Sequence, residues 1–220
     1  MGGIHDGHIS LINRSKRLCK KTIVSIFVNP KQFNNKKDFK TYPKNIKNDL
    51  SILRKIKGID FVYVPKFNDI YNYKRKSKIL INKKDKILCA KFRKNHFEGV
   101  LDVMDRLTNL IKPDKIFMGK KDFQQFYLVK KFIEKKYKTK IIPCKTIRDK
   151  NKLALSSRNF LFNKKELNRA RVIAKTLFNL KKNLVNKKNL YKTLLIKKRL
   201  MEDSFNIKIQ YLELRNVKTL

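Results

Sequence analysis

The sequence predicts an α/β protein: a Rossmann-like, doubly wound parallel sheet followed by a smaller α+β domain. β-branched apolar runs such as residues 22–28 are typical of strands covered on both faces of a parallel sheet. These runs alternate with amphipathic helical patterns up to residue 146, as in a doubly wound fold. From Lys164 onward the pattern changes to two helices and one last strand. We therefore expect domains at residues 1–146 and 147–220.

Each element is placed by its own pattern. A helix follows His8 directly, and apolar residues at helical spacing predict further helices at about residues 44–57, 100–111, 122–137, 164–182 and 188–205. Gly58 ends the second helix, and Asp122 is the predicted N-cap of the fourth. Short apolar runs predict strands near residues 22–28, 60–64, 115–118, 141–143 and 209–214. Residues 66–95 give no clear pattern.

The composition is that of a globular chain with an unusual charge. The 220 residues are 41% hydrophobic, and the net charge is +40. A field of this sign attracts any polyanion. The lysines, however, are spread over the whole chain, whereas a nucleic-acid surface concentrates them on one element. Our hypothesis is that the charge reflects base composition, and we do not expect nucleic acid as a partner.

Cysteine usage and hydropathy indicate the compartment. The three cysteines, Cys19, Cys89 and Cys144, are far apart and in no metal-ligand spacing, which suits a reducing environment. The sequence contains no apolar run of membrane-spanning length and no signal peptide. We therefore expect a cytoplasmic protein with no membrane partner.

The opening residues, MGGIHDGH, are the strongest local motif. His5 and His8 lie at the start of the first helix, where unpaired N–H groups and the helix dipole favour a phosphate. Gly7 allows close approach to the backbone, and a histidine carries a proton near neutral pH. The motif predicts a nucleoside triphosphate site. Two solvated histidines remain an alternative; half a zinc site is the weakest one, because no cysteine or third histidine lies nearby.

Polar residues also follow the first strand. Asn29 and Gln32 come directly after residues 22–28. Ligands of open α/β sheets bind outside the carboxyl ends of the strands. These two side chains are therefore candidates for substrate contact.

Four separated stretches resemble the pantoate–β-alanine ligase (pantothenate synthetase) family: MGGIHDGH, SIFVNPKQF, GKKDFQQ and LSSRN. Their order and spacing also agree, and the likeness extends over essentially the whole chain. The resemblance implies that the carboxylate of pantoate attacks the α-phosphate of ATP, with Mg²⁺ present, to give pantoyl adenylate and pyrophosphate. The amine of β-alanine then displaces AMP. It also implies a homodimer.

The resemblance implies roles for individual residues. It implies catalytic roles for His5, His8, Lys121 and Arg158, with His8 as the acid. It implies that ATP contacts Met1, Gly2, Gly3, Ile4, Asp6, Gly7, Gly119, Lys120, Asp122, Ile147, Leu155, Ser156 and Ser157 as well. Gln32 and Gln125 would hold pantoate, with Asn29 and Tyr42 beside them. It implies no protein ligand for a metal, and Arg93 and His96 would organise a loop.

The chain departs from the family pattern at several points. Lys120 stands where the family commonly has Glu, Asn151-Lys152 where it has Asp-Gly, and Lys94-Asn95 where it has Pro-Gly. Family members also usually have a further central strand before the position of Met1, and they continue past Leu220. Without that strand we expect an open apolar groove and unpaired strand edges. We expect the chain as written to be poorly stable or inactive, and an N-terminally extended form to be active.

Two other functions remain open. One is another nucleotidyltransferase with the same His-x-x-His motif, such as a cytidylyltransferase or a phosphopantetheine adenylyltransferase; the pair Gln32 and Gln125 argues against it. The other is a basic RNA-binding protein derived from a ligase.

Overall fold

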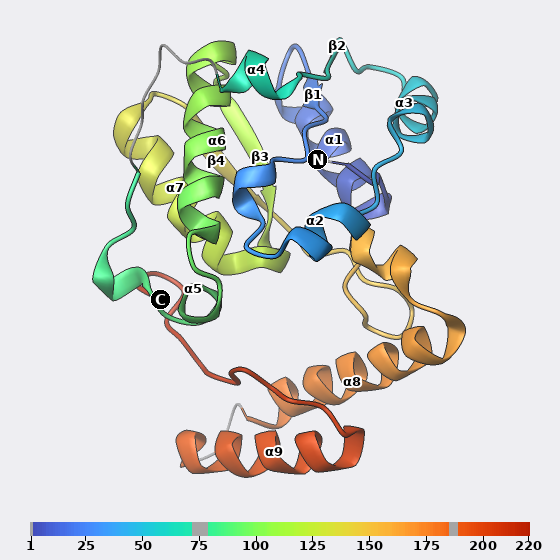
Figure 1. Ribbon diagram of the computed structural model, residues 1–220, viewed down its shortest axis with the longest axis vertical. Helices are drawn as coiled ribbons and strands as arrows, with labels where there is room; N and C mark the ends of the chain where they lie inside the picture. Colours follow the sequence, from blue (N-terminus) through green and yellow to red (C-terminus); the bar gives the residue numbers. More distant parts are fainter. Residues whose placement is uncertain (1, 72–78, 185–188) are drawn as a thin grey trace. The chain divides into compact units, whose positions relative to one another are not determined.

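The computed structural model describes residues 2–71, 79–184 and 189–220, and the chain divides into two compact units (Figure 1). The first unit comprises the chain up to Ile147 together with Leu155–Phe160. The second comprises Arg148–Ala154 and Leu161–Leu220. The segment containing Ser156 to Arg158 thus returns to the first unit, where the N-terminal motif lies.

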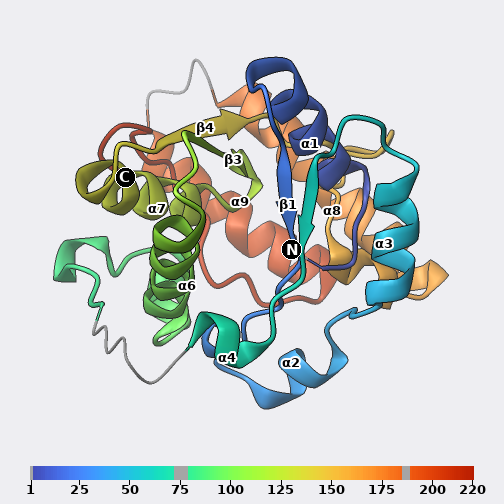
Figure 2. The ribbon, with the colours of Figure 1, turned by 90° about the horizontal axis from the view of Figure 1, so that it is seen from above.

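The strands of the first unit are all parallel to their partners, as predicted. Strand β1 (Ile23–Ser25) pairs with β2 (Phe61–Tyr63), and β3 (Lys115–Gly119) pairs with β4 (Lys140–Cys144). The described strands form two separate two-stranded sheets, not one continuous sheet (Figure 2). The predicted α/β class and the parallel pairing of the strands are confirmed, and in the described residues the strands are divided between these two sheets.

The helices of the first unit match the predicted periodicities closely. The long ones are α1 (Asp6–Leu18), α3 (Ile46–Arg54), α6 (His96–Ile111) and α7 (Phe123–Lys136). Short helices are α2 (Lys36–Thr41), α4 (Phe67–Ile70) and α5 (Cys89–Phe92), and the 3₁₀ turns are η1 (Pro30–Gln32), η2 (Lys83–Asp85), η3 (Lys120–Asp122) and η4 (Ser157–Leu161). In the residues described between 66 and 95, where no element was predicted, the helical turns are short.

The largest core cluster covers the β3–β4 sheet. Helix α6 packs on α7, and α7 packs on β4. The buried cluster comprises Ile141 of β4 and, from the two helices, Phe97, Val100, Leu101, Phe126, Leu128, Val129 and Ile133. A second cluster joins α1, β1 and α3 through Ile12, Val24 and Leu53. Helix α1 also packs against β3, so it contacts both sheets.

The β1–β2 sheet is less covered than the sequence predicts. Only three residues of the predicted strand 22–28 pair with a neighbour, and Ile23 is 40% exposed. On β2, Phe61 is 56% exposed, so the prediction of a buried strand at 60–64 is wrong. The reason is that β1 pairs on one side only, and β2 is the outer strand of a two-stranded sheet.

A glycine allows α6 to approach the turn that follows β1. A Cβ atom on Gly99 would lie 2.3 Å from the carbonyl oxygen of Lys31, so only glycine fits there. His96, in the first turn of the same helix, lies with its Nδ1 2.6 Å from the carbonyl oxygen of Gln32. These contacts fix the turn that carries Gln32, as expected for a loop-organising role of His96.

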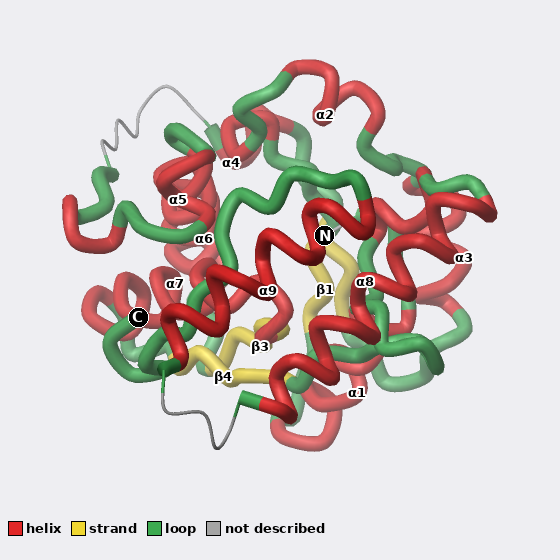
Figure 3. The backbone as a smooth tube through the Cα atoms, turned by 90° about the horizontal axis from the view of Figure 1, so that it is seen from below, coloured by secondary structure: helices red, strands yellow, loops and turns green. Residues whose placement is uncertain are grey.

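The second unit is built from two helices, α8 (Lys164–Asn183) and α9 (Leu190–Phe205). Helix α8 begins with a capping box in which Asn163 and Glu166 bond each other's backbone N–H. The predicted strand at residues 209–214 is wrong: this segment is loop (Figure 3), and the N–H of Ile209 donates to the Glu202 carboxylate instead, at 2.7 Å. An isolated bridge between Arg148 and Ala154 is the only β pairing in the described part of this unit. None of the described helices is long and apolar enough to span a membrane.

Two of the family departures adopt the backbone conformation that favours glycine. Asn95 has φ +60° and Lys152 has φ +71°. Asparagine tolerates this left-handed region, but a lysine side chain is strained there. The loop geometry is thus retained without the glycine, at a cost in conformational energy.

We predict that Lys152→Gly is more stable than Lys152→Ala by about 1 kcal/mol, because only glycine adopts this φ without strain. The alanine variant is the matched control, since both substitutions remove the contact between the Lys152 ammonium and the Phe178 ring. Urea unfolding of both variants measures the difference. Equal or greater stability of the alanine variant would contradict a left-handed residue at this position.

Candidate functional site

The N-terminal motif is held from one side by a buried aspartate. Asp49, in α3, is 1% exposed. Its two carboxylate oxygens accept the backbone N–H of Gly3 at 3.0 Å and that of Ile4 at 2.8 Å. A carboxylate buried in this way needs such donors. It therefore fixes the residues that lead into α1.

Ser157 holds the motif from the other side. Its hydroxyl lies 3.0 Å from the carbonyl oxygen of Gly2 and 2.9 Å from that of Gly3, and it donates to these acceptors. Gly3 has φ +63°, and a Cβ there would lie 3.0 Å from the Cβ of Ser157. The close approach explains the glycine, and it brings residues 156–158 beside the motif.

His5 is the N-cap of α1, and this fixes its tautomer. Its Nδ1 accepts the backbone N–H of Gly7 at 3.0 Å. A neutral imidazole that accepts at Nδ1 carries its proton on Nε2. His5 therefore presents an Nε2–H donor at the start of the helix. A Cβ on Gly7 would lie 2.6 Å from the imidazole Cε1, so glycine is required beside it.

His8 lies against His5, with ring centroids 4.1 Å apart, and it is the most perturbed titratable group of the motif. Burial lowers its pKa to about 3, and the charges of His5 and Lys121 add to the effect. Burial also lowers the pKa of His5. Both shifts favour the neutral imidazole in the ligand-free site over the protonated form considered from the sequence. Within the described residues, no atom forms a hydrogen bond with the buried Nδ1 of His8.

A bound anion would change both features of the histidine pair, the unpaired Nδ1 of His8 and the lowered pKa values of His5 and His8. A polyanion placed against the histidines would accept hydrogen bonds and raise both pKa values. The neighbouring N–H groups at the start of α1 favour the same ligand. The site is thus complementary to phosphate oxygens.

A cavity of about 1060 Å³ opens between the two sheets and contains most of the predicted site residues. Its apolar wall comes from α1, β1, α6 and β3. The predicted residues that line it are His5, Gly7, His8, Asn29, Gln32, Tyr42, Gly119, Lys121, Asp122, Gln125, Ile147 and Leu155. The residues that follow β1, the residues that follow β3 and the first turn of α1 therefore all line the same cavity.

The other predicted residues lie outside this lining. Gly2, Ile4 and Ser157 are buried, and Gly3 is half-buried, where they support the motif. Ser156 accepts the backbone N–H of Arg158 with its hydroxyl at 3.4 Å. Asp6, Lys120 and Arg158 are exposed side chains. Met1 lies outside the described residues.

The structure distinguishes Asn29 from Gln32, and Gln124 from Gln125. Asn29 is buried, and its amide is already engaged: it donates to the carbonyl of Gly99 at 3.1 Å and accepts from the Tyr71 hydroxyl at 3.0 Å. Asn29 therefore braces the turn, in contrast to Gln32, which it precedes. Likewise Gln124 donates to the carbonyl of Ile87, whereas its neighbour Gln125 lines the cavity.

The positive charge of Lys121 lowers the pKa of both His5 and His8. It lies in η3, directly after β3, and its ammonium is 3.1 Å from the carboxylate of Asp122. Because Lys121 is partly exposed and on the cavity wall, its charge faces the same space as His8. This arrangement fits an anion between the lysine and the helix start.

Two acidic residues of this region are not predicted from the sequence. Asp49 holds the motif across 45 and 46 residues of chain, and Asp38 forms an ion pair with Arg158 across 120 residues. Neither has a local sequence signal, because an aspartate on a polar helix is ordinarily solvent-exposed. Only the fold brings each acid to its partner.

A family model described as pantoate-beta-alanine ligase matches residues 1–220. The chain belongs to this family. It is 38% identical over 226 residues to the pantothenate synthetase of Leptospira biflexa, an alignment that covers 100% of this chain and 78% of the relative. It is 42% identical over 178 residues to that of Endomicrobium trichonymphae, covering 80% and 62% of the two chains.

Solved structures of the family have the same fold. Pantothenate synthetase from Thermus thermophilus superposes with a TM-score of 0.92 at 26% identity, covering 100% of this chain and 80% of that one. The ligase from Francisella tularensis, complexed with β-γ ATP and β-alanine, has a TM-score of 0.84 at 35% identity, covering 98% and 79%. The Rossmann-like fold class is therefore confirmed.

The described residues offer no cage for a metal ion. No group of three or more His, Cys, Asp and Glu side chains among them is arranged to hold one. Mg²⁺ ordinarily keeps several waters and binds through one or two carboxylates and substrate phosphates. Asp122, on the cavity wall, is compatible with that manner of binding.

We predict that His8 makes folding acid-sensitive. Its pKa of about 3 in the folded chain lies below the ordinary value of 6.5, so the unfolded state binds a proton first as the pH falls. Stability is then lost between pH 6.5 and pH 3, by about 2 kcal/mol at pH 5. His8→Gln, which does not titrate, should lose about that much less between pH 7 and pH 5 in urea unfolding. Identical pH profiles would contradict the depressed pKa.

We predict that Asp49→Asn lowers the free energy of unfolding by roughly 2 kcal/mol, because an amide keeps one acceptor and turns an NH₂ group toward the other backbone N–H. Asp203→Asn, on α9, is the control, and it should change stability by less than about 0.5 kcal/mol. Thermal or urea unfolding measures both. Unchanged stability of Asp49→Asn would show that the carboxylate does not hold the motif in solution.

Proposed function

We propose that this chain catalyses the ATP-dependent condensation of pantoate with β-alanine to pantothenate, through a pantoyl-adenylate intermediate, with release of pyrophosphate and AMP. The observation that carries the proposal is the convergence of His5 and His8 at the start of α1 with Gln32 and Gln125 in one cavity. Membership of the ligase family supports it.

In the first step, a carboxylate oxygen of pantoate attacks the α-phosphorus of ATP, and the bond to the bridging oxygen of pyrophosphate breaks. Negative charge builds on the phosphate oxygens. The Nε2–H of His5, the N–H groups of α1 and the ammonium of Lys121 are placed to stabilise it. His8, buried and neutral at rest, gains a proton as the anion raises its pKa, and then donates to the phosphates.

Pantoate itself is held by amides in this proposal. Gln32 follows β1 and Gln125 lies in the first turn of α7, and both side chains line the cavity. An amide both donates and accepts, which suits hydroxyl and carboxylate groups on one small acid. Apolar side chains on the cavity wall would contact the aliphatic part of the acid.

In the second step, the amine of β-alanine attacks the acyl carbon, and AMP leaves with the electron pair of the acyl–oxygen bond. An acyl adenylate hydrolyses in water, so a site with apolar walls protects it. Arg158 and the segment around it stand at the motif and would hold the phosphates, since a guanidinium matches phosphate oxygens.

Mg²⁺ would enter with ATP. When bound it offsets the charge of the phosphates, and Asp122 is the protein carboxylate placed to contact it. On family likeness alone, we further propose that the chain acts as a homodimer in the cytoplasm.

The test is exchange of pyrophosphate into ATP, assayed with pantoate and without β-alanine. We predict exchange that depends on pantoate, and a Gln32→Ala variant whose KM for pantoate is raised about tenfold or more, because one good hydrogen bond to a substrate is lost. Gln210→Ala, an exposed glutamine of the other unit, is the control and should leave KM unchanged. Exchange without pantoate, or an unaffected Gln32→Ala variant, would overturn the proposal.

A further inference from the structure

The guanidinium of Arg158 is held by a single acid from a distant helix. Its Nε and Nη2 donate to the two oxygens of Asp38, at 3.2 and 2.9 Å. The guanidinium carbon also lies 5.1 Å from the centre of the Tyr42 ring and 6.0 Å from that of Phe33. The side chains of Arg158 and Asp38 are 45% and 39% exposed, so the pair lies at the surface, beside Tyr42, which lines the cavity.

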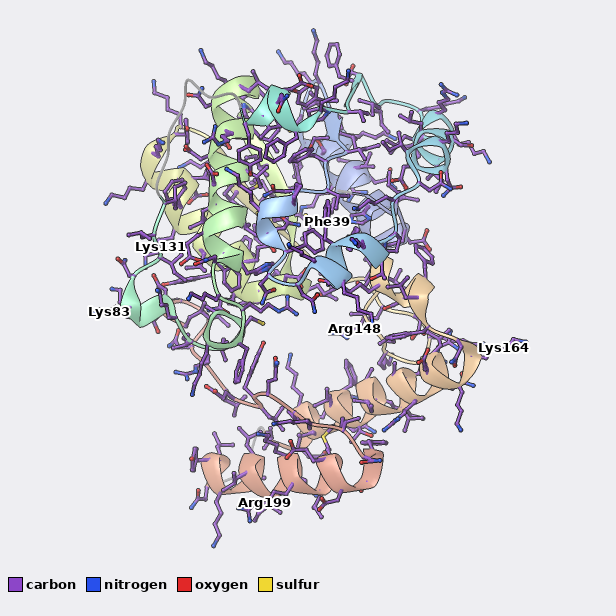
Figure 4. All side chains as sticks on the ribbon, in the orientation of Figure 1. Phe39, Lys83, Lys131, Arg148, Lys164 and Arg199 are labelled. Carbon is purple, nitrogen blue, oxygen red and sulfur yellow. The ribbon has the colours of Figure 1, made fainter. Side chains whose placement is uncertain are left out.

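The position of Asp38 is itself well defined. It lies in the first turn of α2, where a negative charge is favoured and where Asn35 caps the helix by accepting the N–H of Lys37 at 2.7 Å. The other charged residues of α2 are lysines, so Asp38 is its one carboxylate. Next to it, Phe39 packs edge-on against Phe33, with ring centroids 5.2 Å apart (Phe39 is labelled in Figure 4).

The ion pair joins two parts of the proposed site. Helix α2 follows η1, the turn that carries Gln32, whereas Arg158 follows Ser157, which is bonded to the N-terminal motif. Asp38 therefore ties the segment on the pantoate side to the segment on the phosphate side. Helix packing alone does not provide that link, because α2 contributes no buried residue.

We propose that Asp38 is a positioning residue for ATP: it holds the guanidinium of Arg158 in place beside Tyr42 before the nucleotide binds. This inference rests on the proposed function. A guanidinium has five N–H donors, and the bonds to Asp38 use two of them, which leaves three for phosphate oxygens. Holding a long side chain in one rotamer in advance lowers the entropic cost of binding.

If Asp38 had a purely structural role, its replacement would lower the stability of the fold and would not selectively weaken ATP binding. An exposed ion pair contributes little to the stability of a fold. The loss of Asp38 should therefore leave the unfolding transition almost unchanged and weaken ATP binding. The opposite electrostatic effect, in which the carboxylate repels the triphosphate or competes with it for Arg158, would make the variant bind ATP more tightly.

The experiment measures ATP binding by titration calorimetry, without pantoate, for five variants and the unmodified chain. Asp38→Asn should weaken ATP binding about five- to tenfold, the size expected when one charge-assisted contact is lost. Asp38→Glu should restore most of the affinity. Asp203→Asn, in the other unit, changes the net charge equally and should have no effect. Arg158→Ala, alone and combined with Asp38→Asn, completes a double-mutant cycle.

In the Arg158→Ala background, Asp38→Asn should have no further effect, because the aspartate acts only through the arginine. Unchanged or tighter ATP binding by Asp38→Asn, or an equal loss in the Arg158→Ala background, would overturn the proposal. The steady-state kinetics give a second readout: KM for ATP should rise while kcat changes less than twofold. If the unmodified chain binds ATP but shows no pantoate-dependent exchange, the ligase proposal fails while the binding series still decides the role of Asp38.

Discussion

The site depends first on the carboxylate of Asp49 and the two backbone N–H groups that it accepts. A buried carboxylate without a cation is costly, and the N–H groups of Gly3 and Ile4 offset that cost only in one arrangement of the chain. The residues before α1 are thereby fixed, and His5 is placed to cap the helix. The tautomer of His5 and the burial of His8 follow from this placement.

The site has an excess of positive charge and of hydrogen-bond donors that a bound anion would balance. His5 and His8 are held neutral by burial, the ammonium of Lys121 stands close to them, and the whole chain carries a net charge of +40. A triphosphate supplies the missing negative charge and the missing acceptors together. The general excess of lysine strengthens the attraction at long range, but it does not select a site, since basic side chains such as Lys83, Lys131, Lys164 and Arg199 project from many different elements (Figure 4).

Sequence periodicity predicts the helices well because each amphipathic pattern is local. The ends of α6, α7, α8 and α9 lie within a few residues of the predicted ones, and the parallel direction of the strands is confirmed. The strand at 209–214 fails because an apolar run forms a strand only where a neighbouring strand can pair with it. Asp38, Asp49 and the engaged amide of Asn29 are not predictable, because their partners lie 42 to 120 residues away and nothing local marks them.

The division of the strands into two sheets determines what holds the site together. His5, His8 and Gln32 belong to the side of β1, whereas Lys121 and Gln125 belong to the side of β3. Hydrogen bonds between strands do not join these halves in the part of the chain that the structure describes. They are joined by packing: α1 lies against β3, and α6 lies against η1, where Gly99 allows the backbones to touch. Helix packing is more tolerant of small shifts than a hydrogen-bonded ladder, so the spacing of the two halves depends on these packing contacts and on the polar contacts that cross between them. Long-range polar contacts therefore help to fix the geometry of the site. The buried hydrogen bond from the Asn29 amide to the carbonyl of Gly99 crosses between the two halves. Asn29 thus holds the halves together, in addition to bracing the turn that carries Gln32.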